Sequence, residues 1–162
     1  MSTALVAIKS KESNGELTQL VSFTLSHEEY GVEVLKVREI IRMAGITHMP
    51  NAPHYLEGII NLRGKVIPVI SMRKRFGMTE LEHSAQTRII IMDIEGELMG
   101  FIVDAVSEVI RISAGEIQPP PTAASDGGEQ ECIAGVINRS DRLLVLLNLD
   151  RIFSREEKQL FA

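Results

Sequence analysis

The sequence predicts an all-β protein made of two copies of one β-unit. Two segments, "YGVEVLKVREIIR" (30–42) and "MGFIVDAVSEVIR" (99–111), align at a constant offset of 69 positions. A second pair, "GIINLRGKVIPVISMRKRF" (58–76) and "GVINRSDRLLVLLNLDRIF" (135–153), aligns at an offset of 77 positions. Short apolar runs between regularly spaced turn residues are typical of a small β-barrel or sandwich, with roughly five short strands expected in each copy.

The repeat also predicts how the chain is organised. The expected parts are a flexible N-terminal segment (1–16), a first β-barrel subdomain (17–85), a second β-barrel subdomain (86–153) and a short C-terminal helix (154–162). The second copy carries eight extra residues in a stretch rich in proline, glycine and small polar residues, which is typical of a surface loop. The helix is expected because Ser154 and the glutamate three positions later form a capping-box pattern.

Two corresponding strands differ in their hydrophobic pattern. "LVSFTLS" (20–26) alternates apolar and polar residues, which indicates a half-buried strand. Its counterpart "RIIIMDIE" is apolar on both faces from Ile89 to Met92, and such a strand is covered on both sides. We therefore expect the second unit to press one face against the first unit or against a partner. "VREII" and "VSEVI" fit either a helical turn or a bend between two strands, and "SMRKRFG" fits one helical turn.

The composition excludes several classes of protein. The 162-residue chain has a formal net charge of −5 and only 4% aromatic residues, which disfavours general nucleic-acid binding. Cys132 is the only cysteine, so no intrachain disulfide or cysteine-based zinc site is possible. The N-terminus lacks a signal-peptide pattern, and no apolar run approaches the roughly 20 residues of a membrane span. A soluble cytoplasmic protein is expected.

The stretch "EGIINLRGKVIPVI" (57–70) superficially resembles a phosphate-binding loop. Gly58 and Gly64 are separated by five residues instead of four, and Val66 stands where the loop needs a hydroxyl group. Pro68 follows within a strand pattern, so the phosphate-loop interpretation fails. No other catalytic or cofactor-binding motif is present, and neither an enzyme nor a cofactor is expected.

The remaining reactive groups favour structural roles. His48 and His54 flank a proline-bound loop without a further metal ligand nearby, so no metal site is expected. Cys132 follows acidic residues, which disfavours a reactive thiolate. The basic cluster "RKR" (73–75) fits the solvated face of a helical turn, or alternatively a patch for an acidic partner or nucleic acid.

Pro68 and Arg63 point instead to a docking surface. Because proline cannot donate to a sheet ladder, the Pro68 strand is expected at a sheet edge or with that amide position directed outward. An unprotected edge can accept another protein. Asn61 and Gly64 fit the first and fourth positions of a type I turn, which places Arg63 at its tip.

Four segments in the same order resemble the CheW family of chemotaxis coupling proteins. They are "EEYGVEVLKVREII", "GIINLRGKVIPVISMRKRFG", "VDAVSEVIRI" and "CIAGVINRSDRLLVLLNLDRIFS", and the resemblance runs from about Leu17 to Leu160. It implies two five-stranded SH3-like barrels around a shared apolar interface, and a scaffold without catalysis. It also implies two partners, the cytoplasmic tips of chemoreceptors (methyl-accepting chemotaxis proteins) and the regulatory domain of the histidine kinase CheA. The protein would be cytoplasmic and recruited to membrane-associated receptor arrays.

The resemblance also implies site residues. The positions that match the receptor groove between the barrels are Val37, Arg63, Val106 and Val109. The positions that match the kinase-binding region are Val34, Glu39, Glu57 and Gly58. A second kinase contact would involve Gln118, Thr122 and Ala123, where small residues offer little anchor area.

Two alternatives remain open. A CheW-like domain also occurs in CheV, fused to a phosphorylatable receiver, and the absence of a receiver in this sequence favours CheW. The other alternative is a duplicated SH3-like module that binds nucleic acid, which retention on heparin with a steep salt dependence would indicate.

Overall fold

The computed structural model describes residues 17–120 and 132–153, and these residues are mainly β-structure. The strands are β1 (Leu17–Leu25), β2 (Glu28–Glu33), β3 (Val37–Arg42), β4 (Leu56–Leu62), β5 (Lys65–Ser71), β6 (Arg88–Ile94), β7 (Glu97–Val103), β8 (Ala105–Ser113), β9 (Ile117–Gln118), β10 (Ile133–Arg139) and β11 (Arg142–Leu147). The short helical elements are η2 (Val34–Lys36), α2 (Met72–Arg75), η3 (Ala114–Glu116) and η6 (Leu149–Arg151). The expected all-β class is confirmed. The expected N-terminal segment and C-terminal helix lie outside the described residues. Among the described residues, no helix is long and apolar enough to span a membrane.

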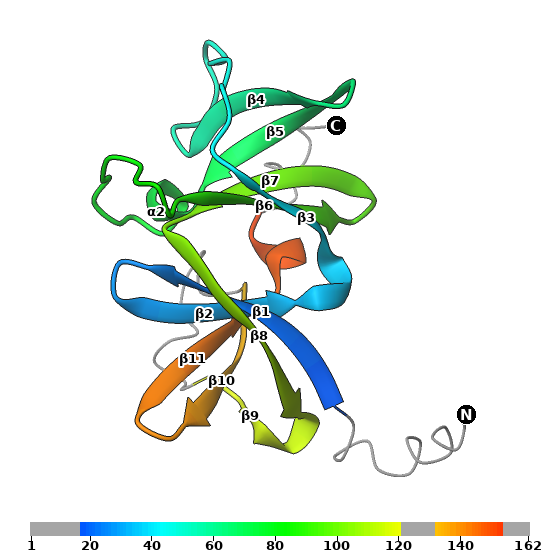
Figure 1. Ribbon diagram of the computed structural model, residues 1–162, viewed down its shortest axis with the longest axis vertical. Helices are drawn as coiled ribbons and strands as arrows, with labels where there is room; N and C mark the ends of the chain where they lie inside the picture. Colours follow the sequence, from blue (N-terminus) through cyan, green and yellow to red (C-terminus); the bar gives the residue numbers. More distant parts are fainter. Residues whose placement is uncertain (1–16, 121–131, 154–162) are drawn as a thin grey trace.

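The strands form two barrel-like sheets that lie one above the other in Figure 1. The lower sheet, called sheet A, has the order β8-β1-β2-β11-β10-β9. The upper sheet, called sheet B, has the order β3-β6-β7-β5-β4. The segments "VREII" and "VSEVI" lie in β3 and β8, so both are strands. "SMRKRFG" contains the single helical turn α2, and the Ser71 hydroxyl caps it by accepting a hydrogen bond from the Lys74 backbone N–H.

The two sequence copies exchange their hairpins. The β1–β2 hairpin of the first copy pairs with β8 and β11 of the second, and the β6–β7 hairpin of the second copy pairs with β3 and β5 of the first. The registers are equivalent, since Val69 pairs with Gly100 and Leu146 pairs with Gly31. Each sheet therefore contains strands of both copies, and the expected boundary between residues 85 and 86 does not separate the two sheets. The equivalent hairpins carry similar apolar faces, so a repeat alone does not decide which copy pairs with which.

Three apolar clusters hold this arrangement together. Sheet A and sheet B each enclose a smaller cluster, and the largest cluster lies between them and takes side chains from both. Along β6, Ile89 and Ile91 face the interior of sheet B, whereas Ile90 and Met92 face the cluster between the sheets. The prediction that this strand is covered on both faces is confirmed, and its second face packs against the other half of the molecule.

The β4–β5 turn differs from the expected type I turn. Leu62 pairs with Lys65, so the loop contains only Arg63 and Gly64. Both loop residues have positive φ angles, +50° and +87°. Positive φ at both central positions is the signature of a type I′ turn, whose twist matches that of the flanking strands.

Pro68 does not lie on an edge strand, because β5 is flanked by β4 and β7. Pairing between β5 and β7 begins only at Val69, directly after the proline. In the equivalent β11–β2 pair, pairing already begins at Leu144, and Val145 takes the place of the proline. The β5–β7 ladder is therefore shorter at Pro68 than its counterpart at Val145, and of the two expected positions for the proline the edge strand is wrong.

Gly58 fits a place that no side chain can occupy. Its φ is +152°, and a Cβ atom there would lie 2.1 Å from the Thr47 carbonyl oxygen. We expect Gly58→Ala to lower the free energy of unfolding by roughly 1–3 kcal/mol, through strain and backbone displacement. Urea denaturation followed by circular dichroism measures this change.

The matched control is Gly45→Ala, because an added Cβ at Gly45 meets nothing within 4 Å. That variant is expected to stay within about 0.5 kcal/mol of the parent protein. Equal stability losses in the two variants would contradict the close approach of β4 to Thr47.

Candidate docking surfaces

Val37 and Val106 lie at repeat-equivalent positions beside the contact between the sheets. Val37 pairs with Met92 of β6, and Val106 pairs with Phe23 of β1. Both valines are half-buried and pack against the cluster between the sheets. In Figure 1, β3 rises from the region of sheet A into sheet B, and β8 descends from sheet B into sheet A. The two valines thus mark corresponding points on the two crossing strands.

Val109 has an exposed counterpart that the sequence interpretation did not include. Val109 is 58% exposed, and its repeat equivalent Ile40 is 38% exposed. Val109 pairs with Val21 and Ile40 with Ile90, and both of these partners face the cluster between the sheets. Directly paired residues share a face of the sheet, so Ile40 belongs to the same apolar surface. Because Ile40 aligns with Val109 at the repeat offset of 69 positions, the sequence repeat would have identified Ile40.

We call Val37, Ile40, Val106 and Val109 the inter-sheet apolar strip. It comes from two strands that bear the same pattern, a half-buried valine followed three positions later by an exposed apolar residue. An apolar face of this kind suits the apolar side of a partner helix.

Arg63 lies in the β4–β5 turn of sheet B and reaches β3 through Glu39, the residue that precedes Ile40. Its guanidinium donates to the Glu39 carboxylate of β3, with Nη1 at 3.3 Å from Oε2 and a second contact between Nη2 and Oε1. This hydrogen bonding holds the pKa of Glu39 below its usual value. Arg63 remains 71% exposed. A residue expected in the receptor groove is therefore paired with one expected at the kinase surface.

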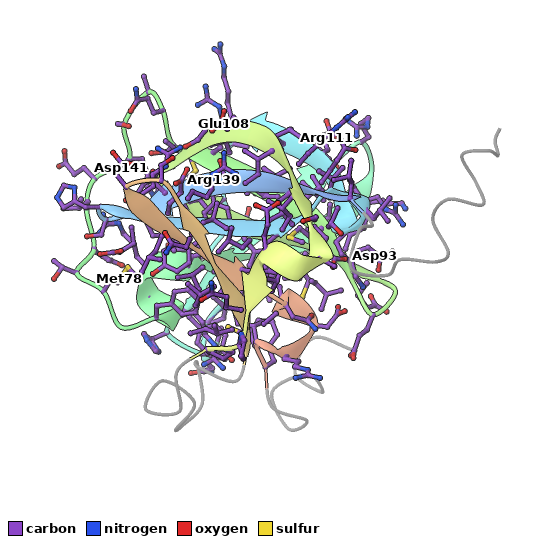
Figure 2. All side chains as sticks on the ribbon, turned by 90° about the horizontal axis from the view of Figure 1, so that it is seen from below. Met78, Asp93, Glu108, Arg111, Arg139 and Asp141 are labelled. Atoms are coloured by element: carbon purple, nitrogen blue, oxygen red, sulfur yellow. The ribbon has the colours of Figure 1, made fainter. Side chains whose placement is uncertain are left out.

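Sheet A carries a related but different arrangement. Arg142 lies 3.2 Å from Glu29 and 3.7 Å from Glu108, which is the repeat equivalent of Glu39. Figure 2 shows Glu108 on β8 and the neighbouring Arg139 and Asp141 on the β10–β11 hairpin, viewed from below. The two sheets thus end in similar glutamate–arginine pairs, and the arginine comes from a different hairpin position in each.

The other residues expected at the kinase surface have mixed roles. The Glu57 carboxylate is ion-paired with Lys74 at 2.8 Å and is only 17% exposed. Gly58 is buried, and Val34 packs against the cluster between the sheets. These two residues shape the surface and offer little area for contact. Gln118 is exposed at the end of β9, whereas Thr122 and Ala123 lie outside the described residues.

The "RKR" cluster is occupied by internal contacts. Arg73 donates from Nε and Nη2 to Asp104 at 2.8 and 2.6 Å, and Lys74 lies between Glu57 and Glu80. The Arg75 guanidinium lies 4.9 Å from the centroid of the Tyr55 ring and donates to the Ile152 carbonyl. Neither a solvated face nor a free basic patch describes this cluster.

Asp104 lines a cavity of about 620 Å³, together with residues of both sheets. Burial raises the pKa of Asp104, but hydrogen bonds from Arg73 and from the Ser26 backbone N–H outweigh it. The pKa of this carboxyl group therefore lies below its usual value. Within residues 17–120 and 132–153, no group of three or more histidine, cysteine or acidic side chains is arranged to hold a metal ion.

Comparison with known proteins identifies the fold. The family model described as "CheW-like domain" matches residues 19–157. The chain belongs to the CheW-like family. The chemotaxis protein CheW of Helicobacter pylori is 33% identical over 146 residues, covering 90% of this chain and 87% of the relative. CheW of Rhizobium meliloti is 37% identical over 141 residues, covering 87% and 90%.

A solved CheW structure agrees with this assignment. The scaffolding protein TtCheW from Thermoanaerobacter tengcongensis superposes with a TM-score of 0.80 at 38% identity, covering 88% of this chain and 96% of that chain. The expected CheW fold with two barrel-like sheets is therefore confirmed, and the chain is a chemotaxis adaptor of the CheW type.

Proposed function

We propose that this CheW-type adaptor joins the cytoplasmic tip of a chemoreceptor to the regulatory domain of the histidine kinase CheA, without catalysing a reaction. The observation that carries the proposal is the presence of two chemically different surfaces on one CheW-like fold. One is the inter-sheet apolar strip, and the other is the charged edge of sheet B around Glu39 and Arg63. An adaptor needs such separate surfaces so that both partners can bind at once.

The apolar strip suits the receptor. A receptor tip is helical, and a helix binds a groove by laying a row of apolar side chains into it. Val109 and Ile40 are exposed enough to meet such side chains, and Val37 and Val106 are half-buried against the cluster between the sheets.

The charged edge of sheet B suits the kinase. Glu39 and Glu57 lie on β3 and β4, the two outer strands of this sheet. Both carboxylates are held by cations, Glu39 by Arg63 and Glu57 by Lys74, so their positions are set before a partner binds. A second kinase contact near Gln118, Thr122 and Ala123 remains part of the proposal, as does recruitment of a cytoplasmic protein to the receptor arrays.

Isothermal titration calorimetry tests the proposal, with a purified receptor-tip fragment and the kinase regulatory domain as titrants. Arg63→Glu is expected to lower both affinities roughly tenfold at low salt, and less at high salt. The change removes the cation expected at the receptor groove and the group that holds Glu39.

Arg63→Lys is the matched control because it keeps the charge, and we expect it to retain most of the binding. If Arg63→Glu left the affinity for both partners unchanged, the role of Arg63 in docking would be wrong. Retention on heparin, with a steep loss on adding salt, would instead favour the nucleic-acid-binding alternative.

A further inference from the structure

Asp104 lies at one of the two points where the chain crosses between the sheets. It follows β7 of sheet B and precedes β8 of sheet A. Its carboxylate accepts hydrogen bonds from the Arg73 guanidinium at 2.8 and 2.6 Å and from the Ser26 backbone N–H at 2.7 Å. Its own backbone N–H donates to the Thr24 carbonyl at 3.1 Å. One residue therefore holds the helical turn that follows β5 against the β1–β2 hairpin of sheet A.

The other crossing, between β2 and β3, is held far more weakly. The repeat equivalent of Asp104 there is Leu35, whose side chain is 88% exposed. The equivalent of Arg73 is Asp150, which makes one ion pair of 2.8 Å with Lys36. Lys36 is 42% exposed, whereas Arg73 is only 11% exposed. The two crossings therefore differ in their contacts. The Asp104 crossing is held by several hydrogen bonds, whereas among the described residues the β2–β3 crossing has one ion pair.

The crossing at Asp104 also connects the two proposed docking surfaces. Lys74, the neighbour of Arg73 in the four-residue helix α2, is bound to Glu57 on the proposed kinase surface. Asp104 is directly followed by β8, which carries Val106 and Val109 of the inter-sheet apolar strip. A displacement of Lys74 must be shared by Arg73, because both belong to the same helical turn.

We propose that Arg73 and Asp104 form a positioning pair that couples kinase binding at Glu57 to the placement of β8, and thereby to the affinity of the apolar strip for a receptor helix. This inference rests on the proposed function. Neither residue needs to touch a partner; the pair transmits the position of α2 to the start of β8. Loss of the pair uncouples the two binding events and leaves each surface able to bind.

The test is a thermodynamic cycle measured by calorimetry. The dissociation constant of a receptor-tip fragment is measured for the full chain alone and in the presence of saturating kinase regulatory domain. We expect the two constants to differ at least fivefold in the parent protein, a typical size for coupling between sites. In Asp104→Asn, which keeps the shape and removes the charge, the ratio is expected to fall to within about twofold of unity. Each separate affinity is expected to stay within about threefold of the parent value.

Two further variants serve as a second test of the pair and as a control at the other crossing. Arg73→Lys keeps the positive charge but loses the two-point geometry, and it is expected to uncouple the sites as well. Lys36→Met breaks the ion pair at the other crossing and is expected to keep the parent ratio. Circular dichroism confirms that each variant is folded before it is titrated.

A ratio of one in the parent protein, or a ratio unchanged in both Asp104→Asn and Arg73→Lys, would overturn the coupling while leaving the adaptor function intact. Equal loss of coupling in Lys36→Met would also overturn it, since the two crossings would then be equivalent. A parent protein that binds neither fragment would overturn the proposed function, and this inference with it.

Discussion

Replacement of Phe101 by alanine is expected to lower the free energy of unfolding by about 3–5 kcal/mol. Phe101 is 1% exposed and lies in the cluster between the sheets. Its strand neighbours in the ladder are Ile90 of β6 and Ile70 of β5, which belong to the same cluster. The substitution leaves a cavity where side chains of the two sheets meet. Urea denaturation followed by far-ultraviolet circular dichroism measures the change.

Val66→Ala provides the comparison, because Val66 is also a strand residue of sheet B but is 66% exposed. Its stability is expected to change by no more than about 0.5 kcal/mol. A loss below about 1 kcal/mol for Phe101→Ala would mean that the central cluster does not join the sheets as described.

The second large effect is expected on binding. Val109→Glu places a carboxylate on the inter-sheet apolar strip and is expected to weaken receptor-tip binding at least thirtyfold, since an unpaired charge would be buried under the partner helix. Val109 is 58% exposed, so the fold should tolerate the change. Ile40→Glu is expected to act in the same direction because Ile40 is its repeat equivalent. Calorimetry with the receptor-tip fragment measures both.

Leu143→Glu is the matched control, since Leu143 is a 57% exposed strand residue of sheet A outside the strip. It is expected to leave receptor binding within about twofold, and the kinase affinity of all three variants should be retained. If Leu143→Glu weakened receptor binding as much as Val109→Glu, the receptor surface would have to be placed elsewhere.

The repeat in the sequence was enough to predict the fold class and the number of units, because each copy has the same strand pattern. It could not predict the exchange of hairpins. β1 and β6 occupy equivalent positions, and either pairing buries similar apolar faces. The edge-strand alternative for Pro68 is wrong for a related reason. A proline removes one amide only, so β5 can still pair on both sides, with β4 along its length and with β7 from Val69 onward.

The contacts of the basic cluster could not be read from the sequence either. A run of three cations predicts local charge, but the partners of Arg73 and Arg75, which are Asp104 and the Ile152 carbonyl, lie 31 and 77 positions away. Ile40, in contrast, was predictable in principle. It aligns with Val109 at the repeat offset, and applying that offset to each expected site residue would have included it.

The most direct test of the adaptor function is to ask whether one chain binds both partners at the same time. The full chain, a receptor-tip fragment and the kinase regulatory domain are mixed and analysed by sedimentation velocity. The separate surfaces predict a complex that contains all three components, and Val109→Glu should remove only the receptor fragment from it. Two binary complexes that exclude each other, or no complex at all, would contradict the account.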